Sequence, residues 1–238
     1  MTYASRHRAK RLRALPVVLF LAHSLRAFAA DGLDYSYAGL DYSIDSTIQT
    51  YGDSYDSDNS FRLVASYLLN RHLFLSAQYY SAGYDLEFND DFGLSGFSFG
   101  LGYRARIGGG DTIPIDWFAI LSYEHNSTQT QVNHVDNETG RDGGGLKVGI
   151  RAAVTENLEL SFDAYQQSFG SEFMKLNGDL NGLSFELGGA LRLSDRFRLT
   201  AAYRTGELDY RFLDNYPTRY EIEVDRDEVF VGVRWTFE

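Results

Sequence analysis

The feature that most constrains the fold is a strict alternation of residue types at the end of the chain. Residues 227–238 read DEVFVGVRWTFE, in which Val229, Val231, Val233, Trp235 and Phe237 occupy alternate positions. Successive side chains of a β-strand point to opposite faces of the sheet, so these five residues share one face. One face of the segment is therefore apolar, and the other is mostly small or polar.

The same alternation recurs along the chain in about ten segments. Alternate residues are apolar within 61–69, 73–79, 97–107, 115–123, 146–154, 158–164, 183–193 and 197–203, and a less regular first segment covers 34–44. After Ala29 no continuous apolar run is long enough for a membrane-spanning helix, which excludes a membrane protein built from helices. Strands of about 9 to 11 residues cross a membrane with only alternate residues facing lipid.

The segment 1–29 has the composition of an export signal. Residues 6–13 contain five basic side chains, and Ala27 and Ala29 supply the small residues that a signal peptidase reads. Pro16 and His23 interrupt the apolar run between them, which spans about twelve residues, whereas a membrane-spanning helix needs roughly 20. The pattern predicts a cleaved signal peptide over 1–29 and a single β-barrel domain over 30–238.

The remaining chain is strongly acidic. Residues 1–29 contain six of the 22 basic residues and none of the 33 acidic ones, which leaves 16 against 33, a formal charge of −17. A nucleic-acid partner is not expected, because phosphate binding requires concentrated Lys and Arg. The chain has no cysteine, so disulfides and thiolate metal sites are excluded.

Two kinds of connection separate the segments. Short ones lie at 70–72, 155–157, 194–196 and 108–114, and long polar ones lie at about 45–60, 87–95, 126–143, 170–181 and 212–225. Short and long connections alternate, as in bacterial barrels that have periplasmic turns and external loops. We therefore predict an all-β fold in the cell outer membrane: a transmembrane antiparallel up-and-down β-barrel of about ten strands, with short periplasmic turns and long extracellular loops.

This topology places the tryptophans at one interface. Trp117 begins one segment and Trp235 ends another, so both fall at the periplasmic boundary, where amphipathic rings are favoured. With Phe237 they form a predicted aromatic girdle. The terminal strand resembles the aromatic-ended signal that the outer-membrane assembly machinery recognises, with Glu238 added after the usual last aromatic residue.

The inward-facing positions carry many charges. A ten-strand barrel is only slightly wider than the eight-strand kind, whose interior is filled by side chains. One interpretation is an ion-pair network that satisfies the buried charges and largely plugs the lumen. The alternative is the lining of a narrow channel for small solutes, in which the basic excess favours anions. The predicted basic residues are Arg62, Arg104, Arg106, Lys147, Arg151, Arg192, Arg198, Arg204 and Arg234, and the acidic ones are Asp116, Glu124, Glu159, Asp163 and Glu186.

One group of residues is a candidate for catalysis. His125 and Ser127 share a face if they lie in a strand, and Glu138 or Asp136 downstream can orient the imidazole. The His-x-Ser pattern resembles that of outer-membrane lipid A deacylases, although Thr128-Gln129 replaces the Asn-Ala usual after that serine. This resemblance implies a hydrolase acting on lipid A. The omptin proteases also have ten strands, but their paired Asp and Asp-His couple have no counterpart here.

The first predicted loop contains Asp53, Asp56 and Asp58, whose carboxylates are possible oxygen ligands for Ca²⁺. Their spacing lacks the D-x-D-x-D-G register and the closing Glu of an EF-hand loop. We therefore expect a solvated loop, with weak divalent bridging to lipopolysaccharide as an alternative. No cofactor is expected.

By overall pattern residues 30–238 resemble a family of small proteobacterial outer-membrane β-barrel proteins described as porin-like. The resemblance rests on Tyr35, Tyr37 and Tyr42 in the first segment, and on three short motifs: 100–103 (GLGY), 149–151 (GIR) and 232–235 (GVRW). It implies location and fold without an agreed ligand. The leading functional hypothesis is a structural or loop-mediated surface-binding role, ahead of the narrow channel and the lipid hydrolase. Expected partners are outer-membrane lipid, lipopolysaccharide and the assembly machinery.

Overall fold

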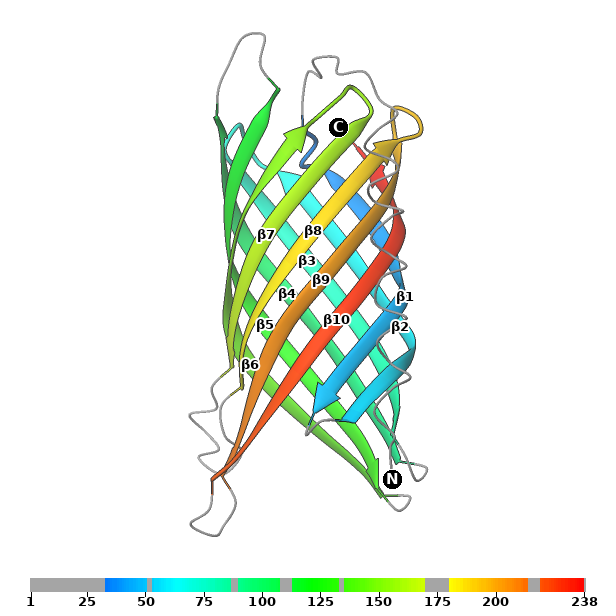
Figure 1. Ribbon diagram of the computed structural model, residues 1–238. Coiled ribbons are helices and arrows are strands. Elements are labelled where there is room, and N and C mark those ends of the chain that lie inside the picture. Colours follow the sequence, from blue (N-terminus) through cyan, green and yellow to red (C-terminus); the bar gives the residue numbers. More distant parts are fainter. Residues whose placement is uncertain are drawn as a thin grey trace.

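Ten antiparallel strands form a closed barrel (Figure 1). The computed structural model describes residues 33–50, 53–86, 90–107, 113–132, 135–169, 180–213 and 219–237, so the predicted signal peptide lies outside the described residues. The strands are β1 (Tyr37–Thr50), β2 (Asp53–Leu68), β3 (Leu73–Leu86), β4 (Asp90–Ile107), β5 (Ile115–Val132), β6 (Val135–Ala153), β7 (Leu158–Phe169), β8 (Leu180–Arg192), β9 (Phe197–Leu213) and β10 (Arg219–Thr236). In this part of the chain no helix is long and apolar enough to cross a membrane.

Pairing of the first and last strands closes the sheet. Leu40 in β1 lies opposite Val233 in β10, and Tyr37 lies opposite Thr236. Each of the remaining strands pairs with the strand before it and the strand after it in the chain. Closure matters because lipid offers no hydrogen-bond partner to an open strand edge. The predicted ten-strand, up-and-down barrel is confirmed.

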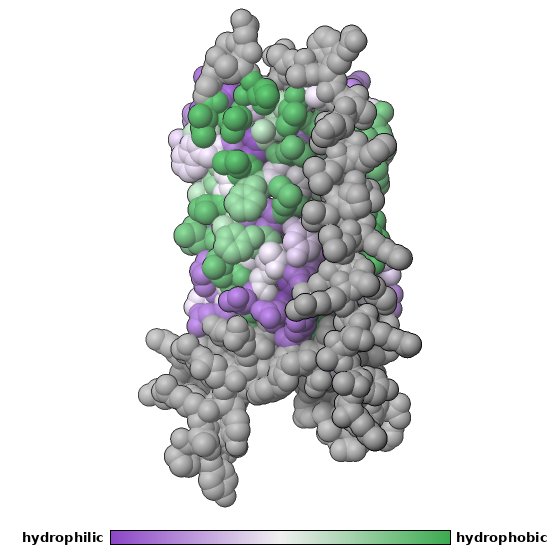
Figure 2. Space-filling model, viewed as in Figure 1, coloured by the Kyte–Doolittle hydropathy of each residue, from purple (hydrophilic) through white to green (hydrophobic). Residues whose placement is uncertain are grey.

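The two faces of the sheet have the polarity of a membrane barrel. Large apolar side chains point outward, with Leu121 71% exposed, whereas Arg62 on the inner face is only 6% exposed. Figure 2 shows the hydrophobic outer surface, with a hydrophilic zone at one end of it. This inversion follows from the solvent, because the outer face meets lipid and the charges must be satisfied inside.

Three tight turns share one local device. The first residue of each turn, Asn70, Thr155 or Ser194, uses its side-chain oxygen to accept hydrogen bonds from two backbone N–H groups ahead of it. The distances range from 2.9 Å at Asn70 to 3.4 Å at Ser194. Asn, Thr and Ser favour such turns because their short polar side chains reach the local backbone. We call this end of the barrel the turn end and the opposite end the loop end; by the usual orientation the loop end faces outside.

The strands extend further than the apolar alternation predicts. Most of the predicted loop at 126–143 is paired strand, since β5 and β6 continue to Val132 and from Val135. Beyond the membrane both faces meet water, so the alternation disappears while the hydrogen-bonded ladder continues. At the other end β1 begins at Tyr37, so residues 34–36 are not part of the predicted first strand.

Candidate functional site

An arginine in the lumen joins opposite sides of the barrel. The Arg62 guanidinium donates from Nε and Nη2 to Asp41 Oδ2 at 3.0 and 2.8 Å, and from Nη1 to Glu186 Oε2 at 2.6 Å. Arg204 donates to the same Glu186 oxygen at 3.0 and 2.8 Å. Because Arg62 comes from β2 and Glu186 from β8, these contacts cross the lumen. They tie together walls that the sheet itself connects only around its circumference.

Another buried acid lies beside this group. Glu228 in β10 is fully buried, and its Oε1 accepts a hydrogen bond from Arg226 Nη2 at 2.7 Å. Arg204 Nη1 lies 3.7 Å from the other oxygen. The sequence prediction missed Glu228, Arg226 and Asp41. The alternation of the last strand would have identified Glu228 and Arg226, because they lie on the same inward face of β10 as Phe230 and Arg234.

A fourth acid, Glu159, lies nearer the turn end and accepts hydrogen bonds from three arginines. Arg151 donates to its Oε1 at 2.9 and 2.6 Å, Arg234 donates to the same oxygen at 3.2 Å, and Arg198 donates to Oε2 at 3.2 Å. The Glu159 side chain is 4% exposed. Three guanidinium groups from three different strands therefore share one buried carboxylate. We refer to residues 41, 62, 151, 159, 186, 198, 204, 226, 228 and 234 as the ion network.

Residues 33–36 fold into the lumen at the turn end, and we call them the plug. The Tyr35 ring lies between two guanidinium groups, with Arg104 at 4.4 Å and Arg151 at 4.3 Å from its centroid, and it contacts Phe74. The backbone of the plug is held as well, since the Leu33 carbonyl accepts from Arg104 and the Asp34 carbonyl accepts from Arg151.

The Tyr35 ring holds the plug through its π face. Burial raises the pKa of the Tyr35 hydroxyl to about 12, so the ring stays neutral at physiological pH. It therefore binds the two arginines by cation–π attraction rather than as an anion. The Asp34 carboxylate adds an ion pair with Arg198.

The other predicted luminal charges lie outside the ion network. Asp116 accepts hydrogen bonds from Arg104 and Arg106, both at 2.9 Å, and Lys147 lies 3.7 Å from Asp163. Glu124 has no ion pair among the described residues and is bound instead by Ser122, Tyr165 and Gln167. Arg192 is exposed and pairs with Asp195 in the turn, so the structure places it outside the ion network.

The outer wall carries the predicted catalytic residues. His125 Nδ1 lies 2.8 Å from Asp142 Oδ1 on β6, and the imidazole stacks on Phe97 with centroids 5.1 Å apart. The Tyr123 hydroxyl donates to the same carboxylate oxygen at 2.5 Å. The acidic partner of His125 is thus Asp142 rather than Glu138 or Asp136. Sequence reasoning missed it because choosing among three nearby acids requires the β5–β6 register.

Ser127 lies on the same face of β5 as His125, two residues further along the strand, and is buried. It pairs directly with Gly140. A methyl group added at Gly140 would lie 3.3 Å from Cε1 and 3.7 Å from Nε2 of His125, so the imidazole lies over this glycine, the cross-strand neighbour of Ser127. Glu138 pairs with Gln129, one step beyond, and its side chain is outside the described residues.

The remaining predicted residues have simple positions. Trp117 and Trp235 are both exposed on the outer wall at the turn end, where Trp235 contacts Phe237 with centroids 5.5 Å apart. Asp56 is exposed on β2, and the side chains of Asp53 and Asp58 are outside the described residues. Among the side chains that are described, no three His, Cys, Asp or Glu residues gather into a possible metal site.

Comparison with known proteins gives the family. A family model described as outer membrane protein beta-barrel domain matches residues 15–181, more than half of the chain. The chain belongs to this family. It is an outer-membrane β-barrel protein, as the alternation and topology predicted, and its location is the outer membrane. No match is found among curated proteins.

Several solved structures are similar at low sequence identity. Neisserial surface protein A shares 16% identity and a TM-score of 0.41, over 87% of this chain and 100% of that one. The attachment invasion locus protein Ail of Yersinia pestis shares 12% identity and a TM-score of 0.40, over 85% and 99%. The outer membrane protease OmpT of Escherichia coli shares 10% identity and a TM-score of 0.44, over 87% and 99%.

Proposed function

We propose that the protein is a largely plugged outer-membrane barrel that acts at the cell surface through its extracellular end, in a structural or binding role. The observation that carries this proposal is the ion network. Its carboxylates Asp41, Glu159 and Glu186 are each held by guanidinium groups from other strands, and Arg62 crosses the lumen. Solute passage would require these buried pairs to separate, which leaves uncompensated charges in a poorly solvated interior.

The plug adds a second barrier at the turn end. Tyr35 is 3% exposed and occupies the lumen between Arg104 and Arg151. With the periplasmic side obstructed twice, the surfaces left to interact are the loop end and the outer wall. We propose outer-leaflet lipid and lipopolysaccharide as the surroundings of that wall, and the assembly machinery as the partner of the terminal strand.

Single-channel recording tests this proposal against the narrow-channel alternative. Purified full-length protein is inserted into planar bilayers in 1 M KCl. We expect no conductance steps above background, and reproducible steps from the unmodified protein would overturn the proposal. Insertion is verified separately by protease accessibility of the same bilayer preparation, so that failure to insert is not mistaken for a protein that does not conduct.

A second candidate function is hydrolysis of an acyl ester in the outer leaflet, and the His125–Asp142 contact specifically favours it. With Nδ1–H donated to Asp142, Nε2 is left to accept the hydroxyl proton of Ser127. The serine oxygen would attack the ester carbonyl and expel the alcohol, which takes that proton from the imidazole. Water would then release the fatty acid from the acyl-serine. Both residues belong to the outward-facing set of β5, which is the side of the barrel that meets lipid.

Mass spectrometry of lipid A from expressing cells tests the hydrolase. Loss of one acyl chain is expected with the unmodified protein and should be abolished by His125→Ala and by Ser127→Ala. Ser81→Ala is the matched control, because Ser81 also faces outward but lies two strands away on β3. An unchanged lipid profile with the unmodified protein would reject this function and leave the surface role intact.

A further inference from the structure

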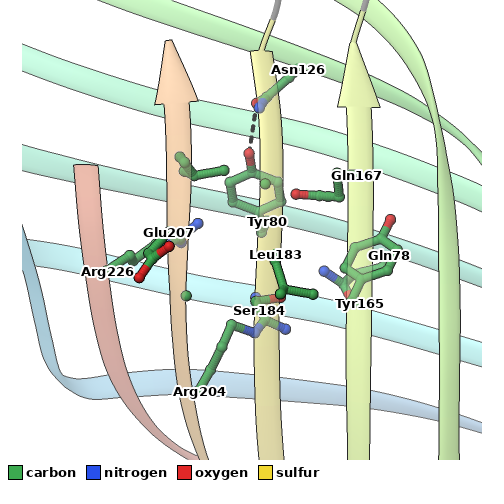
Figure 3. Close-up of a pocket in the computed structure, with 13 residues that line it drawn as sticks. Gln78, Tyr80, Asn126, Tyr165, Gln167, Leu183, Ser184, Arg204, Glu207 and Arg226 are labelled. Atoms are coloured by element: carbon green, nitrogen blue, oxygen red, sulfur yellow. Dashed lines mark hydrogen bonds between the residues drawn. The ribbon is translucent and has the colours of Figure 1, made fainter. Parts of the chain in front are cut away.

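A recess lies inside the loop-end half of the lumen, above the ion network. Its volume is about 520 Å³, counting the part open to solvent, and six strands contribute to its lining: β3, β5, β7, β8, β9 and β10. Figure 3 shows Asn126 near its loop-end side and Arg204 on the opposite side. Arg204 also binds Glu186, so the ion network borders the recess on this side.

Two amides that line the recess are held in fixed orientations. Tyr80 donates its hydroxyl to Asn126 Oδ1 at 2.6 Å, which leaves the Asn126 amide nitrogen as a donor (Figure 3). Gln167 uses its amide nitrogen toward Glu124 Oε2 at 3.5 Å, which leaves its carbonyl oxygen as an acceptor. The lining therefore offers one oriented donor and one oriented acceptor. Groups fixed in advance bind a ligand with a smaller loss of side-chain entropy.

Other lining groups have unused hydrogen-bonding capacity. Within the described part of the chain, the Gln78 amide and the Ser184 hydroxyl form no side-chain hydrogen bond. The Nε–H of Arg226 is buried and has no acceptor among the described residues. This nitrogen has almost no accessible surface, so the capacity that a ligand in the recess can use lies at Gln78 and Ser184.

We infer that the recess binds a neutral, hydroxyl-rich ligand, namely a sugar. A hydroxyl group both donates and accepts, so it suits a lining in which the free amide nitrogen of Asn126 donates, the carbonyl oxygen of Gln167 accepts, and the groups of Gln78 and Ser184 do both. The sugar is either a free molecule or the end unit of a longer glycan.

The charges around the recess favour a neutral ligand over an ionic one. The two arginines in its lining are already matched, since Arg204 binds Glu186 and Arg226 binds Glu228. An anion would also meet the acceptor oxygen of Gln167 and the buried carboxylate of Glu124 behind it. Glu207 also belongs to the lining, but its side chain is exposed to water, whereas a cation inside the recess would approach the two guanidinium groups. The site is thus polar without being electrostatically selective.

Ligand-observed NMR on the full-length protein tests the inference. The protein is folded in lauryldimethylamine oxide, a detergent without a sugar headgroup, and saturation transfer is measured to glucose, maltose, dextran and glucuronate. Glucose and maltose test a free sugar, dextran tests the end of a glycan, and glucuronate tests an anion of the same ring type. Titrations of the unmodified protein are compared with Gln78→Ala and Ser184→Ala. Ser76→Ala is the control, because Ser76 lies two residues from Gln78 on β3 and does not line the recess.

We expect transfer to at least one neutral sugar, weakened roughly fivefold in affinity by Gln78→Ala and by Ser184→Ala, as the loss of one hydrogen bond implies. Ser76→Ala should bind as the unmodified protein does. Absence of transfer to glucose, maltose and dextran would overturn the inference. So would transfer that neither recess variant weakens, or stronger binding of glucuronate than of the neutral sugars.

Discussion

The two halves of the lumen use similar polar residues in opposite ways. At the turn end Glu159 is shared by three arginines, and Tyr35 of the plug is enclosed by two. At the loop end the recess has amide and hydroxyl groups with capacity left over, among them Gln78 and Ser184. Polar groups that satisfy one another close a space, whereas groups that do not can receive a ligand. The comparison distinguishes a turn end closed by matched charges from a loop end that keeps unmatched polar groups, which is what the proposed surface role and the inferred sugar site require.

The largest effect is expected from Glu159→Ala at the turn end. It leaves Arg151 and Arg234 without their carboxylate partner, and removing one member of a buried ion pair costs about 3–5 kcal/mol. Urea unfolding in detergent micelles measures this loss. Glu207→Ala, at an exposed position of the loop-end half, should change the free energy of unfolding by less than about 0.5 kcal/mol. Equal effects of the two variants would remove the distinction between the halves.

Truncation of the plug tyrosine should have the next largest effect. Tyr35→Ala removes a buried aromatic ring and both cation–π contacts, at a cost of about 3 kcal/mol. Tyr35→Phe keeps the ring, and the Tyr35 hydroxyl has no partner among the described residues, so it should cost less than about 0.5 kcal/mol. Thermal unfolding followed by circular dichroism separates the two. A Phe variant as unstable as the Ala variant would show that the hydroxyl, not the ring, holds the plug.

A smaller effect is expected on the outer wall. His125→Ala breaks a partly exposed contact with Asp142, and such pairs contribute little to stability because water competes for both partners. The free energy of unfolding in urea should therefore fall by much less than for Tyr35→Ala, even if lipid hydrolysis is lost. A loss as large as that of Tyr35→Ala would indicate that His125 has a structural role in the β5–β6 hairpin.

The smallest effect on stability is expected in the recess. Gln78→Ala removes a side chain that forms no hydrogen bond with described residues, so unfolding should shift by less than about 0.5 kcal/mol. The same variant is expected to weaken sugar binding, which makes stability and binding independent readouts. A large destabilisation would show that Gln78 has a structural role in the lumen and contradict the expectation that it serves only in ligand binding.

The fold was predictable from sequence because lipid imposes a period of two on every strand that it contacts. That constraint fixes strand number, the inward parity of Arg62 and Glu186, and the turns at Asn70 and Thr155. It ends at the membrane boundary, which is why the paired extension of β5 and β6 was predicted as a loop. Outside the membrane a strand and a loop are both rich in polar residues, so the sequence does not distinguish them there.

The sites were less predictable because they depend on register and on chain reversal. Asp142 becomes the partner of His125 only when β5 and β6 are aligned residue by residue, a choice that the acids at 136, 138 and 142 leave open in the sequence. The plug was missed for another reason. Leu33 and Tyr35 share the inward parity of Asp41, but the sequence does not show that the strand begins only at Tyr37, which lets these two residues pack on Arg104 and Phe74.

The position of the plug in the chain has a consequence for the order of assembly. Its contacts come from β3, β4, β6 and β9, and the adjoining Tyr37 lies under Arg234 of β10 at 4.2 Å. The binding place for residues 33–36 is therefore incomplete until strands from both halves of the chain have come together. We therefore expect the plug, although it precedes the described strands in the chain, to dock only after those strands have paired.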